Sequence, residues 1–458
     1  MKEVDALESR LACPACAAAA IRLSELDGRC GECGTFFPVI DSLPWLFPEP
    51  EVALSEWRGR LHLLLEHLSR EAALHRRDLE RAHPGELTRQ RLRHLASSYE
   101  DQGRRVAELL APIGLGARQE RYEVHLALGT RLPLSQGLTT YYSNVHRDWS
   151  WGEEENRVSL EAVRNGLGAL DPAGALLVLG SGAGRLAYDL HQSSSHTLTV
   201  ALDFNPLLAT IGQRVSTGEA VELYEFPIAP RSIAAHAVLR RLAAPAPARP
   251  GLRFVLADAL ATPFRAGAFD VVLTPWFVDI VPDPLPALMR RLNRLLPKGG
   301  RWVVFGSLAW ADRPPAECFS LEELLALAPE AGFEPMLQAE HEIPYMRSPA
   351  SRHARLESAV CACFVKRREV EPAARPATRP DWLERSDVAV PALPEFREQA
   401  LSTRVYAFIM AMIDGQRSIR DMAALMEQQR LMPAADAEPA IRRFLQRMHE
   451  DARRRADF

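Results

Sequence analysis

The sequence predicts an α/β fold whose central part is a doubly wound, mostly parallel, Rossmann-like sheet. Three observations support this prediction. Short apolar runs alternate with helical segments, a glycine-rich turn follows the first run, and acidic residues follow the next two. Runs of this kind are typical of parallel strands that helices cover on both faces. The five runs are Ala175–Leu179, Thr197–Leu202, Leu252–Leu256, Val271–Thr274 and Arg301–Phe305.

Length and charge restrict the class of protein. A chain of 458 residues exceeds what one hydrophobic core usually serves, so we expect several domains. The net charge of -4 gives no electrostatic reason to expect a nucleic-acid partner. The N-terminus lacks the basic start and apolar run of a signal peptide, and no apolar run approaches the length of about 18 residues that a membrane span needs. We therefore expect a soluble, cytoplasmic protein with no membrane partner.

Composition shifts divide the chain into five segments. A cysteine-containing unit is expected over residues 1–50, where clustered prolines end it. Leucines at helical spacing among arginines and glutamates predict a helical connector over residues 51–140. The α/β domain follows over residues 141–368. A second cluster of prolines predicts a linker over residues 369–394 and a separate C-terminal domain over residues 395–458.

Four cysteines near the N-terminus have the spacing of a metal site. Cys13 and Cys16 form one C-x2-C pair, and Cys30 and Cys33 form a second pair. Four thiolates can surround Zn²⁺ tetrahedrally and leave no position for water, so such a site is structural. We therefore predict a small zinc ribbon, with free buried thiols or a redox pair as the alternative.

The glycine-rich turn is the strongest chemical signal in the sequence. Gly180, Gly182 and Gly184 follow an apolar strand and precede a helix, and such a turn lets a cofactor approach the backbone closely. The next strand ends in Asp203, whose carboxylate can accept hydrogen bonds from both ribose hydroxyls. The following strand ends in Asp258, which can reach the exocyclic amine of adenine. The structural alternative for either aspartate is a helix N-cap.

The order of these motifs resembles the class I methyltransferase family. The match includes the turn Leu296-Pro-Lys-Gly-Gly-Arg-Trp-Val, which follows a helix and precedes a strand. The resemblance implies a class I methyltransferase fold with S-adenosylmethionine as cofactor, and the sequence contains no recognisable hydride-transfer site for a nicotinamide. It also implies that Arg185, Ala259 and Pro275 belong to the cofactor site.

Two segments are similar to the carnosine N-methyltransferase family. The first is "NVHRDWSWGEEENRVSL" before the glycine turn, and the second is "TPWFVDIVPD" after the fourth strand. The first match implies that Asn144 and Arg147 reach the methionine end of the cofactor, with Arg147 pairing its carboxylate. Tyr345 matches a tyrosine of that family. His353 is the candidate to replace an imidazole that the family carries after its Gly-Pro-Leu segment and this chain lacks.

The second match places Asp279 in the acceptor site. A neutral imidazole nitrogen is nucleophilic, so catalysis needs mainly that the ring is held in one tautomer in line with the sulfonium methyl. Asp279 would accept a hydrogen bond from the other ring N–H and stabilise the imidazolium that develops. The alternative makes Asp279 a cap or a surface residue.

Both ends of the chain resemble known modules. The cysteine unit, continued by "GTFFPVIDSLPWLFPEP", is similar to the zinc-ribbon activator subunit of tRNA and protein methyltransferases, which implies a stabilising or docking surface. The C-terminal segment resembles the peptide chaperone of pyrroloquinoline quinone biosynthesis, which implies a winged-helix-like domain and a peptide or protein partner. A plain structural cap is the alternative for this domain.

The leading hypothesis is a methyltransferase that modifies the imidazole of a histidine-containing small molecule or peptide. A second hypothesis keeps the donor and changes the acceptor to another nitrogen or oxygen, for instance in a natural product or a leader-guided peptide. A third treats the chain as a scaffold that binds S-adenosylmethionine without catalysis. The intact glycine turn and Asp203 favour an enzyme.

Overall fold

The computed structural model describes residues 6–19, 21–81, 85–114, 138–168, 174–310, 313–371 and 387–456. The linker predicted over residues 369–394 therefore lies mostly outside the described residues. The chain forms two compact units, Met1–Pro376 and Ala377–Phe458. Within the described ranges, no helix has the length and apolar character needed to cross a membrane.

A seven-stranded sheet forms the centre of the first unit. Its strand order is β12-β13-β11-β10-β5-β6-β9, and the five strands from β11 to β9 are parallel. All five residues of β5 are buried, as expected for a central strand covered on both faces. The bounds are β5 (Ala175–Leu179), β6 (Leu198–Asp203), β9 (Leu252–Leu256), β10 (Val271–Pro275), β11 (Arg301–Gly306), β12 (Phe333–Tyr345) and β13 (Arg355–Lys366).

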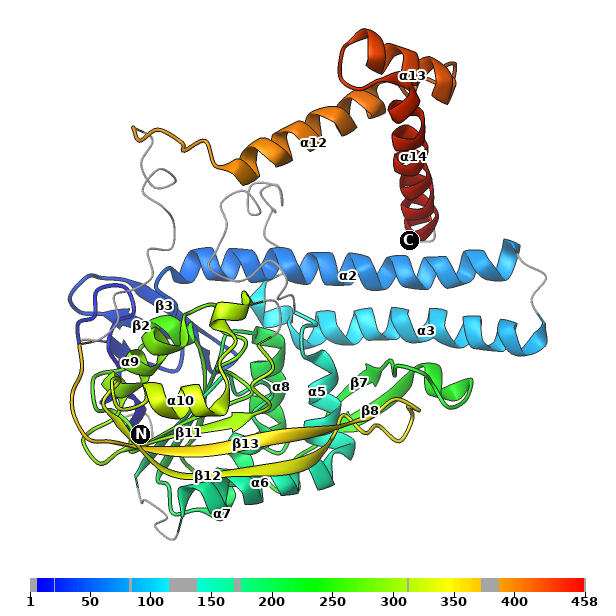
Figure 1. Ribbon diagram of the computed structural model, residues 1–458. Helices are drawn as coiled ribbons and strands as arrows, with labels where there is room; N and C mark the ends of the chain where they lie inside the picture. Colours follow the sequence, from blue (N-terminus) through cyan, green and yellow to red (C-terminus); the bar gives the residue numbers. More distant parts are fainter. Residues whose placement is uncertain are drawn as a thin grey trace. The chain divides into compact units, whose positions relative to one another are not determined.

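Helices cover both faces of this sheet, which confirms the doubly wound prediction (Figure 1). Side chains of α6, α7 and α8 share one apolar core with Leu176 and Val178, whereas α9 and α10 share another with Leu177 and Leu179. Alternate residues of one strand thus serve opposite cores. The bounds are α5 (Tyr142–His146), α6 (Glu153–Leu167), α7 (Arg185–Ser193), α8 (Pro206–Ser216), α9 (Leu285–Leu295) and α10 (Leu321–Leu327); the short helices are η1 (Ala111–Ile113), η2 (Arg147–Trp151), η3 (Ala234–His236), η4 (Ala259–Ala261) and η5 (Pro315–Glu317).

The cysteine unit packs against the β9 edge of the sheet. It contains four short antiparallel strands, β1 (Ile21–Leu23), β2 (Asp27–Cys30), β3 (Phe36–Ile40) and β4 (Leu43–Pro44). The Leu46 N–H donates to the Leu256 carbonyl at 2.7 Å, and the Ala12 N–H donates to the Pro263 carbonyl at 2.9 Å. An uncovered edge strand is prone to pair with other chains, and this unit covers it. Its apolar residues belong to the same two cores as the sheet.

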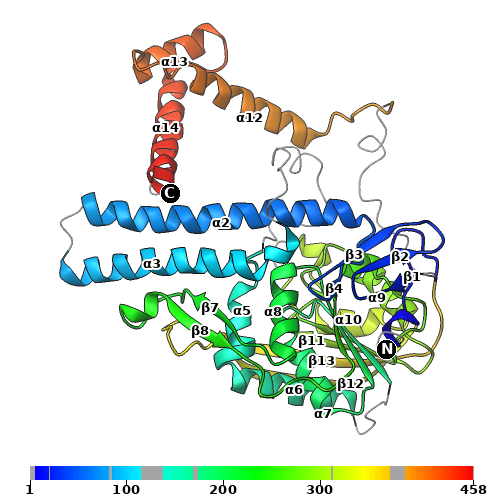
Figure 2. The ribbon, with the colours of Figure 1, turned by 180° about the vertical axis from the view of Figure 1, so that it is seen from behind.

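Two long antiparallel helices, α2 (Pro50–Arg81) and α3 (Glu86–Leu109), follow the cysteine unit and lie side by side in both views (Figures 1 and 2). Trp57 of α2 is fully buried and stacks on Phe204 with ring centroids 6.0 Å apart. Tyr99 of α3 stacks on Phe226 at 4.3 Å, next to the hairpin of β7 (Val221–Glu225) and β8 (Val238–Leu242). Parts of the helical segment predicted over residues 51–140 therefore pack against residues that directly follow β6 and β7.

The second unit contains the helices α12 (Pro394–Ala411), α13 (Ile419–Gln428) and α14 (Ala434–Ala456). They share a small core that includes Ile409, Met412 and Ile441. Ser418 begins α13 with a capping box that Asp421 completes. A winged helix would add a strand pair, and residues 387–456 contain none.

Candidate cofactor and acceptor site

The turn after β5 has a backbone that requires glycine. Gly180, Gly182 and Gly184 have φ values of 66°, 57° and 79°, in the left-handed region. A Cβ at Gly180 would lie 2.5 Å from the Cδ2 atom of Phe277, and a Cβ at Gly184 would lie 2.4 Å from the Cε1 atom of Phe254. At Gly182 a Cβ would meet nothing within 4 Å. The turn is thus packed on two sides and open at its middle glycine.

Asp203 lies beside this turn at the end of β6. Its Oδ2 accepts a hydrogen bond from the Gly182 N–H at 2.7 Å, and its Oδ1 accepts one from the Asn205 N–H at 2.9 Å. The N-cap of α8 is Asn205, so Asp203 is not the helix cap. Burial raises the pKa of Asp203 from 3.8 to about 6. The nearby Ser181 hydroxyl is buried and has no protein partner in the described part of the chain.

These groups fit the ribose of an adenosine cofactor. A carboxylate can accept about four hydrogen bonds, so Asp203 has room for two hydroxyls beside its two backbone donors. The unpartnered hydroxyl of Ser181 and the open space at Gly182 lie at the same turn.

The next strands contribute Asp258, Ala259 and Pro275. Asp258 is the N-cap of η4, and its Oδ1 accepts a hydrogen bond from the Leu260 N–H at 2.8 Å. The capping alternative for Asp258 is therefore realised. Ala259 begins η4, and Pro275 is buried at the end of β10. Because β6, β9 and β10 are parallel, these residues lie at the same edge of the sheet as Asp203.

The helical segment before α6 carries Asn144 and Arg147. Asn144 lies half-buried in α5. The Arg147 guanidinium donates to Asp148 at 2.7 Å and to Glu155 at 2.8 Å, and both carboxylates are buried. A cofactor carboxylate would have to share Arg147 with these two acids. The Arg185 guanidinium also has protein partners: it donates to the Asp189 carboxylate at 2.8 Å and to the Asp148 main-chain carbonyl at 2.7 Å.

A second group of side chains lies at the ends of β10 and β12. Asp279 is 6% exposed, and its Oδ2 accepts a hydrogen bond from the Ala309 N–H at 2.9 Å. The ring centroids of Trp276 and Tyr345 are 5.0 Å apart. The Arg355 guanidinium carbon lies 4.6 Å from the Tyr345 ring centroid, and that of Arg147 lies 5.9 Å away. An aromatic pair and a buried carboxylate thus adjoin the end of β10.

Tyr141 is a site residue that the sequence reasoning missed. Its pKa is raised by burial and then by the negative charge of Asp279, by Tyr345 and by Asp203. Tyr141 therefore lies within electrostatic reach of both Asp203 and Asp279. His353, in contrast, is exposed in the loop after β12, where its backbone N–H donates to the Ser351 hydroxyl at 2.9 Å.

Backbone strain is concentrated around this group. Tyr141, Trp276 and Met346 have φ values of 62°, 49° and 55°. Leu308 and Trp310, which flank the Ala309 N–H bonded to Asp279, have values of 51° and 46°. Left-handed conformations of residues other than glycine cost on the order of 1 to 3 kcal/mol each and accumulate at functional sites.

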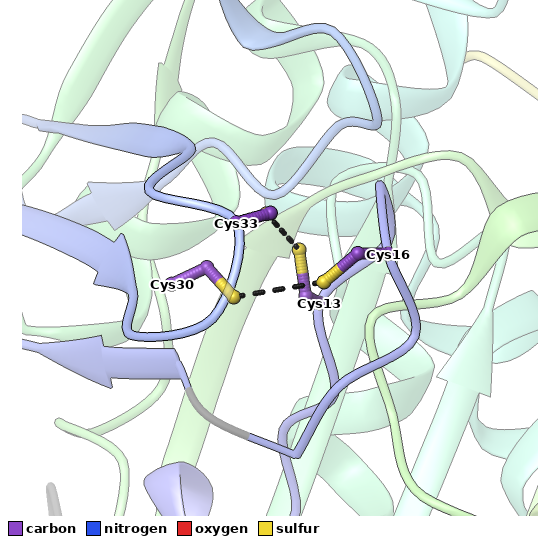
Figure 3. A group of neighbouring side chains, drawn as sticks. All are labelled: Cys13, Cys16, Cys30 and Cys33. Carbon is purple, nitrogen blue, oxygen red and sulfur yellow. Dashed lines mark hydrogen bonds between the residues drawn. The ribbon is translucent and has the colours of Figure 1, made fainter.

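The four N-terminal cysteines come together as the sequence predicts (Figure 3). Their Sγ atoms all lie within 4.8 Å of one another, and the Cys13–Cys33 and Cys16–Cys30 sulfur distances are both 3.7 Å. A tetrahedral zinc with bonds of about 2.3 Å would separate its sulfurs by about 3.8 Å. All four are free thiols. The donor set and its spacing fit a closed zinc site.

Comparison with known proteins identifies the central domain. Residues 177–304 match the family model described as a methyltransferase domain. A search of curated proteins finds none that matches this chain.

Solved methyltransferase structures are also similar to part of this chain. A SAM-dependent methyltransferase from Thermotoga maritima, described as a possible histamine N-methyltransferase, is 20% identical, with 49% of this chain and 93% of that chain covered and a TM-score of 0.29. The 1,6-didemethyltoxoflavin-N1-methyltransferase of Burkholderia thailandensis is 19% identical, with coverage of 50% and 89% and a TM-score of 0.30. A SAM-dependent methyltransferase from Leishmania major is 14% identical, with coverage of 52% and 86% and a TM-score of 0.34. The family match places residues 177–304 in a methyltransferase domain, and the strand order of the sheet gives this domain the class I, Rossmann-like fold.

Proposed function

We propose that this chain is an S-adenosylmethionine-dependent N-methyltransferase that acts on the imidazole of a histidine-containing small molecule or peptide. The observation that carries the proposal is that the buried carboxylate of Asp279 and Tyr345 of the Trp276–Tyr345 pair both lie within electrostatic reach of Tyr141. A flat ring fits against such aromatic side chains, and a carboxylate at its edge can accept the ring N–H.

The cofactor supplies an electrophilic methyl group on a sulfonium sulfur. The turn at Gly182 would hold its nucleoside, with Asp203 accepting the ribose hydroxyls and Ser181 providing a further hydroxyl. Arg147 and Asn144 remain the candidates for the methionine end, although Arg147 already pairs with two carboxylates.

Asp279 would orient the acceptor. Its Oδ2 is held by the Ala309 N–H, and its Oδ1 has no hydrogen-bond partner among residues 138–168, 174–310 and 313–371. The free oxygen would accept the N–H of a neutral imidazole, so that the other ring nitrogen presents its lone pair to the methyl group. As that nitrogen becomes methylated the ring gains positive charge, which the carboxylate stabilises.

Mass spectrometry with free histidine, histidine dipeptides and histidine-containing peptides tests this proposal. We expect a mass gain of one or more methyl groups on imidazole. Asp279→Asn should lower turnover by about 10²-fold or more and leave cofactor affinity near normal. Glu340→Gln, an exposed change on the same strand as Tyr345, is the control. Methylation of another nitrogen or of oxygen, or unchanged turnover of Asp279→Asn, would contradict the proposal.

We also propose that Cys13, Cys16, Cys30 and Cys33 hold one structural zinc ion. The proposal is supported by the sulfur distances, which match tetrahedral coordination. Elemental analysis of purified protein should find one equivalent of zinc, and protein free of zinc with intact folding would contradict it.

A further inference from the structure

Two loops beside the acceptor site are joined into one surface. The first covers residues 226–237, between β7 and β8, and the second covers residues 346–355, after β12 (Figure 1). Pro230 and Ser351 form an isolated antiparallel bridge. The Arg231 N–H donates to the Ala350 carbonyl at 3.0 Å, and the Arg352 N–H donates to the Ala229 carbonyl at 2.9 Å. These bonds hold the two loops in a fixed arrangement.

The joined loops carry positive charge only. Residues 226–237 and 346–355 contain four arginines, two histidines and no Asp or Glu, although the whole chain has a net charge of -4. The arginines are Arg231, Arg347, Arg352 and Arg355, and all four are exposed. We call this surface the arginine rim.

Within the part of the chain that the structure describes, most of this charge has no carboxylate partner. Arg355 pairs with Glu357 at 2.6 Å. The Arg352 guanidinium donates to the main-chain carbonyls of Pro230 and Arg231, which carry no net charge. Across the described ranges, no carboxylate pairs with Arg231 or Arg347. The guanidinium groups of Arg231 and Arg347 therefore have no carboxylate partner among the described residues, and the charge of Arg352 is not compensated by a carboxylate there.

The rim adjoins the candidate acceptor site at Tyr345. That residue ends β12 directly before the second loop, and the Arg355 guanidinium lies over its ring at 4.6 Å. A histidine placed against Tyr345 would thus have its flanking groups beside the arginines. Guanidinium groups bind carboxylates through paired hydrogen bonds, and a single small carboxylate would engage only one or two of the four.

We propose that the arginine rim binds acidic residues that flank the methylated histidine, so that the acceptor is an acidic peptide segment. This inference rests on the proposed histidine acceptor and names its chemical class. Attraction between the rim and the carboxylates would be sensitive to ionic strength, because the arginines are exposed.

Peptide binding to the full chain tests the inference without requiring turnover. Three fluorescent peptides would be compared by anisotropy, each with one central histidine flanked by three glutamates, glutamines or lysines on either side. We expect the glutamate peptide to bind at least 10-fold more tightly than the glutamine peptide at low salt, and to lose most of this advantage at 0.5 M salt. The double change Arg231→Ala with Arg347→Ala should remove the advantage, whereas Arg290→Ala, at an exposed position of α9, should keep it.

The outcomes separate the two proposals. Equal affinity for the glutamate and glutamine peptides, or an advantage that survives the double change, overturns the arginine rim. Methylation of all three peptides with equal kcat/KM also overturns it, while supporting the histidine acceptor. Tight, arginine-dependent binding of the glutamate peptide with no methyl transfer to imidazole would support the rim and contradict the proposed acceptor.

Discussion

Asp203 should make the stability of the protein depend on pH. In the free protein its pKa is raised by burial from 3.8 to about 6, which means that the folded state binds the proton more tightly than the unfolded chain does. The ionised carboxylate therefore weakens the fold. This penalty is absent below about pH 4, grows between pH 4 and 6, and is complete above pH 6. A pKa difference of about 2 corresponds to about 3 kcal/mol.

The test compares the wild-type protein with Asp203→Asn in urea unfolding at pH 4, 5, 6 and 7. The variant offers only one carbonyl oxygen to the two N–H donors of Gly182 and Asn205, so it carries a constant offset in stability. Its side chain does not titrate. The free energy of unfolding of the wild type, relative to the variant, should thus fall by about 2.4 kcal/mol from pH 4 to pH 7.

Cofactor should reduce this pH dependence, since ribose hydroxyls favour the ionised carboxylate. S-adenosylmethionine should accordingly bind the wild type more weakly as the pH falls below about 6. A stability difference between the two proteins that stays constant from pH 4 to pH 7 would refute the reasoning about Asp203 and its burial.

Three further predictions concern the Glu155–Arg147 pair, the glycine turn and the cysteine unit. Glu155→Gln should cost about 1.5 to 3 kcal/mol of stability and raise KM, because one carboxylate holds both Arg147 and the Met346 N–H at 2.8 Å; unchanged KM would contradict this role. Gly182→Ala should weaken cofactor binding with a stability loss near 1 kcal/mol, whereas Gly180→Ala should mainly destabilise the fold. Calorimetric unfolding measures the loss of stability, and titration with the cofactor measures the loss of binding. Cys13→Ser should release zinc and lower the melting temperature by several degrees; a zinc-free variant with unchanged melting would contradict the shared core.

The parallel part of the sheet could be predicted from sequence because of how it is buried. Strands covered on both faces are largely apolar runs, and β5 and β9 begin and end at the predicted residues, whereas β6 is displaced by one. The glycine turn could also be predicted from the sequence. Gly180, Gly182 and Gly184 have left-handed φ values, which favour glycine over other residues at these positions.

Other parts of the site depend on contacts that are distant in sequence. The edge strand β12 is mostly exposed, so it lacks an apolar run. Tyr141 has a left-handed backbone without being glycine or asparagine, and only the effect of Asp203 and Asp279 on its pKa reveals it. The pairing of Arg147 with Asp148 and Glu155 was likewise not predicted. A sequence match identifies the arginine as a candidate but does not identify its partners in the folded protein.

The position of the cysteine unit connects the proposed zinc ion with the cofactor edge of the sheet. Leu46 binds the backbone of Leu256 at the end of β9, and Ala12 binds that of Pro263. The segment between these two points carries Asp258 and Ala259, so the cysteine unit holds it at both ends. The proposed zinc ion would fix the fold of a unit that is too small to have a large core of its own. Loosening that unit would therefore free the segment that we propose to lie beside adenine, although the four cysteines are not among the proposed cofactor-binding residues.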